Sequence, residues 1–412
     1  MDNLTHTLIG AVVAEAAARI IPVTRSVLPA STRRNLYMTL MIVGSNLPDA
    51  DLVYTSFTGG TLSYLLDHRG HTHTLVIAIV LAALMYFASS AWLRWRHVPS
   101  TSTDRYWLAF IAVLAPLLHI GMDATNEYGV HPFWPFNNAW FYGDAIFIVE
   151  PLFWVAAAPL LLLLRGWLTR GLMAIALLLA VGLSFGTGLV PLSMAICLAL
   201  LCAGLLLVAW RASARTAAVS AVVACVVIVA MFLFTSRLAY RQVTALAAAQ
   251  FPDSILVDEV LAPLPVNPLC WEVILMQVND DDYTLRQAMF ALAPGLFDAD
   301  RCSTFSLSGT TTVALSPTTA PDTAKLQWQN EVTMSLTELQ ALVQNNCEAA
   351  AFTQFGRALW IQRQGEGWII GDLRYDREPE LGFAELALPA TPTQCPSNLP
   401  PWIPPRIDVL ER

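Results

Sequence analysis

Long apolar runs recur through the first 236 residues of the chain and then stop. A helix that crosses a bilayer needs roughly 20 mostly apolar residues, so each run is a candidate span. Two further segments are shorter or more polar, and each could be a short span, a re-entrant helix or a helix buried in the bundle. The clear runs are Thr74–Leu93, Tyr106–Met122, Phe147–Leu164, Leu172–Val190, Leu192–Trp210 and Ala217–Phe234, and the ambiguous segments are Leu4–Ile21 and Leu36–Leu47. The pattern predicts a polytopic α-helical membrane protein with about eight membrane-buried helices.

The pattern changes after residue 236 to short apolar segments bounded by Gly, Pro and Asp, which is typical of strands. Between them, Leu336–Asn345 has the periodicity of a helix, with Ser335 as its N-cap. The expected strands are Ile255–Val260, Glu272–Val278, Ser303–Leu307, Thr311–Leu315, Ala358–Gln362 and Gly367–Asp372. We therefore predict two domains: a helical membrane domain over residues 1–236 and a soluble α+β domain with a mostly antiparallel sheet over residues 237–412.

Composition supports a membrane protein and excludes several other classes. Of the 412 residues, 56% are hydrophobic and 13% are charged, whereas a soluble protein has about 25% charged residues. The mean hydropathy is +0.53, and the chain contains a single lysine, Lys325. These values argue against a soluble enzyme, a disordered chain and a nucleic-acid binder. The net charge is +2 over residues 1–236 and −10 over residues 237–412.

Arginines indicate the orientation in the membrane. They lie in alternate loops of the predicted bundle, and positively charged loops face the cytoplasm. The arginines of these loops are Arg25, Arg33, Arg34, Arg94, Arg96, Arg105, Arg165, Arg170, Arg211 and Arg215. The C-terminal domain is therefore expected on the opposite, extracytoplasmic side.

Cysteines give an independent indication of the same orientation. Three lie in apolar runs, and the other four, Cys270, Cys302, Cys347 and Cys395, all lie in the C-terminal domain. An even number of cysteines in an extracytoplasmic domain predicts two disulfides, for which three pairings are possible. Four free thiols are the alternative.

Four polar clusters interrupt the apolar pattern at helix ends, and the predicted orientation places all four at the outer face. Ionisable groups at membrane depth are costly, so they indicate a functional site. The clusters are Thr5-His6, Gly44–Asp51, Asp67–His73 and His119–Asp123.

Each cluster has a functional and a plain structural interpretation. His6 could bind a metal or be an interfacial residue. Asp49 and Asp51 point the same way if the segment is extended, although a solvated Pro-Asp turn would look alike. His119 and Asp123 share a helical face at i and i+4, either as ligands or as a hydrogen-bonded pair. A histidine-rich loop precedes the third predicted helix, for which Thr72 is a candidate cap.

That loop, residues 67–73, contains three imidazoles beside an arginine, which a solvated polar loop explains less well than a metal site. Arg69 could bind a phosphate or carboxylate with its planar guanidinium. Asp51 could be a further ligand or a general base. The predicted metal ligands are His6, Asp49, His68, His73, His119 and Asp123, which fit Zn²⁺ or, alternatively, Mn²⁺.

Other catalytic motifs do not occur in the sequence. There is no GxSxG, no GxxxxGK[ST] and no HExxH, which disfavours a serine hydrolase, an ATPase and a zincin protease.

The four clusters, in this order, resemble the YdjM-type (YfhP-like) family of inner-membrane proteins, to which a metal-dependent hydrolase activity is ascribed. The segments Asn126–Gly129, Pro132–Phe136 and Gly143–Pro151 resemble that family as well. The resemblance covers roughly residues 1–160 and extends loosely to the later helices. His71 matches a variable position of the family, which leaves His68 and His73 as the ligands of this loop. A fainter similarity to zinc-dependent phospholipases C, in the Pro-Asp and His-x-x-x-Asp patterns, suggests a phosphoester substrate.

We therefore expect a multi-pass protein of the bacterial inner membrane that hydrolyses a lipid-like or phosphorylated substrate at the outer face. Membrane lipid and a lipid-like or phosphoester substrate are its expected partners, and nucleic acid is not. Asp144 and Glu150 are expected to orient histidine ligands, and Glu150 is included among the candidate catalytic residues with Asp51 and Arg69. The alternative is a non-enzymatic metal-binding transporter or scaffold, which the clustering of charge at one face disfavours.

Overall fold

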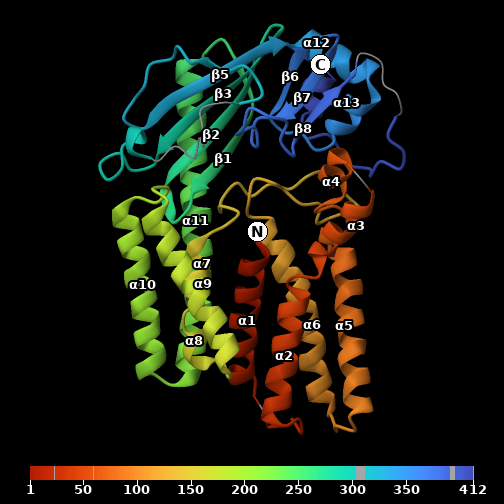
Figure 1. Cartoon of the computed structure of the whole chain (residues 1–412), viewed down its shortest axis with the longest axis vertical. Helices are drawn as coiled ribbons and strands as arrows, with labels where there is room; N and C mark the ends of the chain where they lie inside the picture. The colour runs from red at the N-terminus through yellow and green to blue at the C-terminus, as the bar shows by residue number, and fades with distance from the viewer. Residues whose placement is uncertain (23, 59, 303–310, 390–394, 412) are drawn as a thin grey trace.

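The computed structural model describes residues 1–22, 24–58, 60–302, 311–389 and 395–411. It has two parts, a bundle of helices and a C-terminal part with two sheets that lies over one end of the bundle (Figure 1). The N-terminus lies at that same end of the bundle, between the two parts (Figure 1).

The bundle contains the predicted spans with modest shifts of their ends. Among the described residues, five helices are long and apolar enough to cross a membrane. They are α5 (Leu75–Trp95), α6 (Ser102–Asp123), α9 (Trp167–Gly186), α10 (Leu192–Arg211) and α11 (Ala214–Gln250). Helices α1 (Asn3–Ile20) and α2 (Ala30–Gly44) pack against each other and against α6. A membrane-spanning bundle is thus confirmed, whereas the count of eight is not.

The expected span Phe147–Leu164 is wrong as a single helix. It consists of α7 (Pro151–Ala156) and α8 (Leu160–Leu163), with a break next to Pro159. Proline lacks an N–H and its ring clashes with the preceding turn, so it interrupts a helix interior. Pro151, in contrast, stands at the first turn of α7, where a missing N–H costs nothing.

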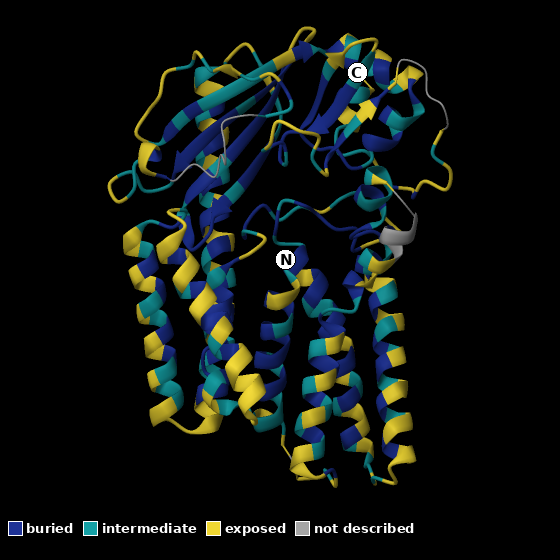
Figure 2. Cartoon of the chain, viewed as in Figure 1, coloured by how far each residue is buried: buried dark blue, intermediate teal, exposed yellow. Residues whose placement is uncertain are grey.

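The outward faces of the bundle are apolar and exposed, as Figure 2 shows along α5, α9 and α10. Leu84 is 61% exposed, Leu178 72% and Leu200 66%. A contiguous exposed apolar surface of this kind is what a bilayer covers.

Helix α11 joins the two parts directly. It has 37 residues, so the predicted boundary at residue 236 falls inside it. Its upper half packs under the larger sheet through Ala239, Val243 and Ala247, which contact Leu261 and Trp271. The connection between bundle and sheet is therefore a continuous helix and not a loop.

The C-terminal part is α+β with antiparallel sheets. The larger sheet has the order β1-β2-β3-β5-β4, and the smaller has the order β6-β7-β8. The strands are β1 (Ile255–Leu264), β2 (Asn267–Asn279), β3 (Asp282–Ala291), β4 (Ser316–Pro317), β5 (Leu326–Ser335), β6 (Leu359–Gln364), β7 (Gly367–Asp372) and β8 (Glu385–Leu388). The short helices are α12 (Leu336–Asn345), α13 (Cys347–Phe352) and α14 (Ile407–Leu410), with a 3-10 turn η3 at Ala299–Arg301.

Most of the predicted elements of this part are confirmed. Helix α12 has the predicted bounds, and Ser335 caps it by accepting a hydrogen bond from the Glu338 N–H. Strands β1, β2, β6 and β7 lie where expected. Residues 311–315 form no strand, and the expected strand at 303–307 lies outside the described residues.

Two disulfides are present, as predicted, and the structure distinguishes among the possible pairings. Cys270 pairs with Cys302, and Cys347 pairs with Cys395. The first bond ties β2 to the turn η3, and the second ties the start of α13 to the segment after β8.

Buried polar contacts fix the C-terminal part above the bundle. Arg357 forms an ion pair with Asp144 at 2.8 Å, and Arg374 Nη1 donates to the Glu127 carbonyl. Trp402 Nε1 donates to the Leu66 carbonyl at 2.8 Å. The end of the bundle that contains the four polar clusters is therefore covered by the C-terminal part.

Candidate metal centre

Four helix ends bring the polar clusters to one buried point. His6 lies in the first turn of α1, and the 3-10 turn η1 (Pro48–Ala50) that follows α2 supplies Asp49. Asp51 begins α3 (Asp51–Thr58), and the loop after α4 (Thr61–Asp67) contains the next histidines and the turn η2 (His71–His73). The last two turns of α6 complete the cluster. Its buried members are His6, Asp49, Asp51, His68, Arg69, His73, His119 and Asp123.

The first group of possible metal ligands consists of Asp49, His73, His119 and Asp123. One ligand atom from each lies within 4.8 Å of the others. His73 Nε2 is 3.0 Å from His119 Nε2, 3.3 Å from Asp49 Oδ1 and 3.2 Å from Asp123 Oδ2. His119 Nε2 is 3.5 Å from Asp49 Oδ1 and 3.4 Å from Asp123 Oδ2.

The hydrogen-bond partners of Nδ1 in His119 and in His73 show which nitrogen of each ring holds the proton. His119 Nδ1 is 2.7 Å from the Ser45 carbonyl oxygen. Because a carbonyl oxygen can only accept a hydrogen bond, Nδ1 holds the proton and Nε2 has a free lone pair. His73 Nδ1 is 3.1 Å from Thr72 Oγ1. The Thr72 hydroxyl already donates to Asp51 at 2.7 Å, and Asp51 Oδ2 itself lies 3.4 Å from His73 Nδ1, so both neighbours of His73 Nδ1 accept and this nitrogen holds the proton.

Two nitrogen lone pairs and two carboxylate oxygens therefore face one another without a proton between them. Without a cation this arrangement is repulsive, and with one it is a mixed imidazole–carboxylate site of the kind that binds Zn²⁺ or Mn²⁺. Fixing the ring through Nδ1–H to a carbonyl or hydroxyl is also how metal-binding histidines are commonly oriented. The residues present thus fit a divalent metal.

A second group consists of Asp49, Asp51 and His68, again with ligand atoms within 4.8 Å of one another. Asp49 belongs to both groups. His68 Nδ1 is 3.1 Å from Asp51 Oδ1. Burial lowers the pKa of His68 although Asp51 raises it, so the ring is neutral at pH 7. Burial raises the pKa of Asp51, but hydrogen bonds from His68 and His73 outweigh it and hold that pKa below its usual range.

His6 lies beside the first group and is not a member of either group. Its ring stacks on His119 with a centroid separation of 3.9 Å, and its Nε2 is 3.2 Å from Asp123 Oδ1. The backbone amino group of Met1 contacts the same carboxylate. In this geometry His6 orients Asp123 and His119.

Arg69 separates the metal ligands from a cavity. Its Nε is 3.2 Å from Asp123 Oδ2, its Nη1 donates to Asn126 Oδ1 at 2.9 Å, and its guanidinium lies over the Tyr128 ring. Its backbone adopts φ 57°, a conformation that directs the side chain back toward α6. The arginine therefore places a positive charge between the candidate ligands and the cavity.

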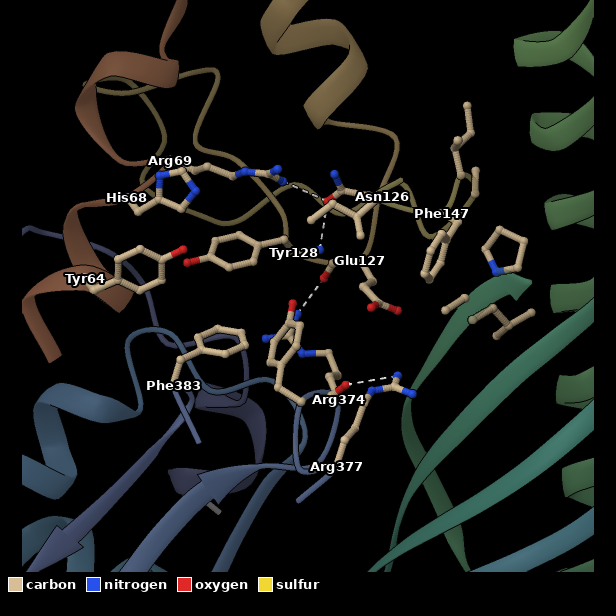
Figure 3. Close-up of a pocket in the computed structure, with 17 residues that line it drawn as sticks. Tyr64, His68, Arg69, Asn126, Glu127, Tyr128, Phe147, Arg374, Arg377 and Phe383 are labelled. Atoms are coloured by element: carbon tan, nitrogen blue, oxygen red, sulfur yellow. Dashed lines mark hydrogen bonds between the residues drawn. The ribbon is translucent and has the colours of Figure 1, made fainter. Parts of the chain in front are cut away.

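The cavity measures about 370 Å³ and lies between the bundle and the C-terminal part. Figure 3 shows Tyr64, His68 and Arg69 on one side and Phe147 on the other, with Arg374 and Arg377 reaching in from the C-terminal part. Glu127 lies between them. Burial raises the pKa of Glu127 to about 7, although Arg377 lowers it.

Three predicted roles are corrected. The cap of α5 is Thr74 and not Thr72, because the Ile77 N–H donates to Thr74 Oγ1. Among the described residues, neither Glu150 nor Asp144 contacts a histidine. Glu150 accepts hydrogen bonds from the backbone N–H groups of Leu152 and Val266.

Asp144 belongs to the contact between the two parts. It pairs with Arg357 and accepts a hydrogen bond from the Tyr240 hydroxyl. A buried carboxylate needs a partner. For Asp144 and Glu150 the partner comes from the C-terminal part and α11, not from a metal ligand.

Sequence patterns did not indicate the residues that the C-terminal part adds to the site. Arg374, Tyr375, Arg377 and Phe383 line the cavity, yet they belong to an ordinary polar segment after β7. Ser45 lies in the predicted cluster Gly44–Asp51, but no role was predicted for it, and its contribution is a backbone carbonyl. Such a contribution leaves no trace in side-chain identity.

The comparisons with known proteins agree with the motifs. Residues 1–192 match the YdjM inner membrane protein family, which confirms the predicted resemblance over this part of the chain. The chain is 28% identical over 160 residues to the uncharacterized protein YfhP of Bacillus subtilis (strain 168), which is 38% of this chain and 44% of that protein. It is 33% identical over 103 residues to the inner membrane protein YbcI of Escherichia coli (strain K12), which is 24% of this chain and 54% of that protein.

The chain thus spans about half the length of these curated relatives. No solved structure matches it. The family and the five apolar helices together support a location in the inner membrane.

Proposed function

We propose that the chain is a membrane-bound, metal-dependent hydrolase that acts on a lipid-like or phosphorylated substrate at the outer face of the inner membrane. The main support is the meeting of two proton-free imidazole nitrogens with two buried carboxylates, directly beside an arginine-lined cavity. The first group would hold one ion, and Asp49, Asp51 and His68 a second. The chemistry supplied by a divalent ion there is polarisation of a phosphoryl or acyl oxygen and activation of water.

The chain's own residues bind and orient. Asp51 accepts hydrogen bonds from the Arg69 N–H and the Thr72 hydroxyl and lies 3.1 Å from His68 Nδ1. With its oxygens engaged in this way, Asp51 is better suited to holding the histidine loop than to taking a proton. The Arg69 guanidinium would bind the substrate anion, and its contact with Asn126 fixes its direction.

The outer face is inferred from two observations. The arginine-rich connections, such as those at Arg94 and Arg211, lie at the end of the bundle away from the C-terminal part (Figure 1). Disulfides persist in an oxidising compartment, and both are in the C-terminal part. We infer that this part is extracytoplasmic and that α1, α2 and the α7–α8 pair lie within the bilayer beside the five long helices.

A non-enzymatic transporter or scaffold remains the second candidate. A transport path would need polar groups that continue down the bundle. On α1, apolar buried residues such as Leu8 and Val12 separate His6 from the next acid, Glu15. Glu15 is itself paired, with Arg34 at 2.8 Å. This arrangement favours a site at one face over a path.

The test of the proposed function is hydrolysis by the purified, metal-loaded chain. We expect turnover of bis(p-nitrophenyl) phosphate or p-nitrophenyl phosphate with Zn²⁺ or Mn²⁺. His73→Ala should remove most of it, because one ligand of the first group is lost. His97→Ala, at the far end of α5, is the matched control and should keep full activity. Metal bound by the wild type without any turnover of either ester would instead support the second candidate.

A further inference from the structure

The cavity beside the metal centre is built by both parts of the protein. The bundle side contributes Tyr64, His68 and Arg69, and the C-terminal part contributes Tyr375, Arg377 and Phe383. A volume of about 370 Å³ falls in the range of small-molecule binding sites. Because residues of the C-terminal part form part of the cavity lining, we expect that part to influence which ligands the cavity binds.

One end of the cavity is suited to an anion. Arg69 is buried, and its ion-pair partner Asp123 belongs to the first ligand group. When Asp123 shares its charge with a cation, the guanidinium is available to a phosphate. Arg374 differs, because its guanidinium forms a two-pronged contact with Asp372 and donates to the Glu127 carbonyl. Arg374 therefore holds the wall, and Arg69 is the anion-binding group.

The other end is suited to an apolar group. It is lined by Phe147 and Ile148, from the segment before α7, and by Leu261 and Pro263 near the end of β1. Ile148 is 40% exposed, so this end reaches the molecular surface. The Ile148 carbonyl accepts a hydrogen bond from the Asp2 N–H, which places this end of the cavity beside the start of α1.

An aromatic wall flanks the anion end and crosses from one part to the other. Tyr64 stacks on His68 at a centroid separation of 5.3 Å and meets Phe383 edge-on at 6.1 Å. Phe383 in turn lies 4.9 Å from Tyr375, and Tyr375 lies 6.0 Å from Tyr128. Phe383 is 45% exposed, so a large apolar side chain stands at the cavity without being needed for the core.

We propose that this cavity binds a phosphate-bearing amphiphile, with the phosphate at Arg69 and the apolar chain along Phe147, Ile148 and Pro263, and that Phe147 (Figure 3) selects for the chain. The proposal rests on the proposed function, because it names the substrate class of that site. A membrane lipid headgroup and a free phosphate ester share the phosphate. The apolar end of the cavity distinguishes the two ligands, because a free phosphate ester would leave that end empty.

The test is equilibrium binding to the full-length, metal-loaded chain in detergent, by calorimetry, with inorganic phosphate and hexyl phosphate as probes. Burial of several methylene groups at the apolar end should make hexyl phosphate bind roughly 10- to 100-fold tighter than inorganic phosphate. Phe147→Ala should weaken hexyl phosphate by about 10-fold and leave inorganic phosphate unchanged. Arg69→Gln should weaken both probes. Val149→Ala is the matched control, because Val149 is exposed in the same segment but does not line the cavity.

Equal affinity for the two probes, or an equal effect of Phe147→Ala on both, would overturn the proposal. Failure of the proposed function looks different. If hexyl phosphate is preferred and the preference depends on Phe147, but no ester is hydrolysed, the amphiphile site stands and the hydrolase does not. If small esters are hydrolysed but hexyl phosphate is not preferred, the hydrolase stands and the amphiphile site does not.

Discussion

Replacement of Arg357 by glutamine should loosen the contact between the bundle and the C-terminal part. The guanidinium is buried and pairs with Asp144 at 2.8 and 3.0 Å and with Asp258 at 2.8 Å. It also donates to the Glu259 carbonyl at 3.1 Å. Attraction to Asp144 and Asp258 outweighs burial and raises the pKa of Arg357, so it is charged at any accessible pH. Without it, Asp144 stays buried with no cation, whereas Asp258 keeps Arg406 at 3.2 Å.

Loss of one partner of a buried ion pair costs about 3–5 kcal/mol. The Tyr240 hydroxyl still donates to Asp144, so we expect the lower part of that range. The assay is thermal unfolding of the purified protein in detergent, followed by tryptophan fluorescence. Arg363→Gln is the control, because Arg363 is 70% exposed in its pair with Glu338 and such pairs contribute at most about 1 kcal/mol.

A double variant sharpens the comparison. Adding Asp144→Asn to Arg357→Gln removes the buried charge that is left without a cation, so it should restore part of the lost stability. The reasoning is refuted if Arg357→Gln and Arg363→Gln lower the unfolding temperature equally, or if the double variant is less stable than Arg357→Gln alone.

Three further outcomes are expected. Because the pKa of buried Glu127 is about 7 instead of 4.5, the folded state binds the proton more tightly, and stability is lost as pH rises from about 4.5 through 7. Glu127→Gln should therefore match the wild type at pH 5 and exceed its unfolding temperature at pH 8, and a constant difference at both pH values would contradict this. Glu150→Gln should keep full metal content, since the carboxylate binds backbone N–H groups far from the ligands, and loss of metal would show that it supports the site. Thiol labelling of the native protein should leave Cys347 unmodified until reductant is added, and rapid labelling beforehand would argue against an extracytoplasmic C-terminal part.

The grouping of the candidate ligands was largely predictable, for a physical reason. Its ligands stand at helix ends, and alternation of spans through a bilayer brings alternate helix ends to the same face. Asp49, His73, His119 and Asp123 could thus be grouped before any coordinate was known. Their protonation could not, because it depends on the Ser45 carbonyl and the Thr72 hydroxyl, whose positions follow from the packing of α2 and the histidine loop.

The errors have a common physical origin in long-range partners. Glu150 needed a partner for its buried charge, and the partner is the Val266 N–H, 116 residues later. Strand β3 (Asp282–Ala291) was missed because arginine, glutamine, alanine and methionine favour helices in isolation. In the sheet it pairs with β2 on one side and β5 on the other. Pairing with neighbouring strands decides the secondary structure of such a segment, and the local sequence pattern carries no information about that pairing.

The most direct test of the account is the metal content of the purified protein by elemental analysis. Wild type, His119→Ala and His71→Ala should be purified side by side without chelator. His71 is the matched control, because it lies in the histidine loop but packs against Trp134 and Trp402 outside both ligand groups. The account predicts at least one Zn²⁺ or Mn²⁺ per chain in wild type and His71→Ala, and a large loss in His119→Ala. A wild type that takes up no divalent metal, or a His119→Ala variant that keeps all of it, would contradict the shared metal centre.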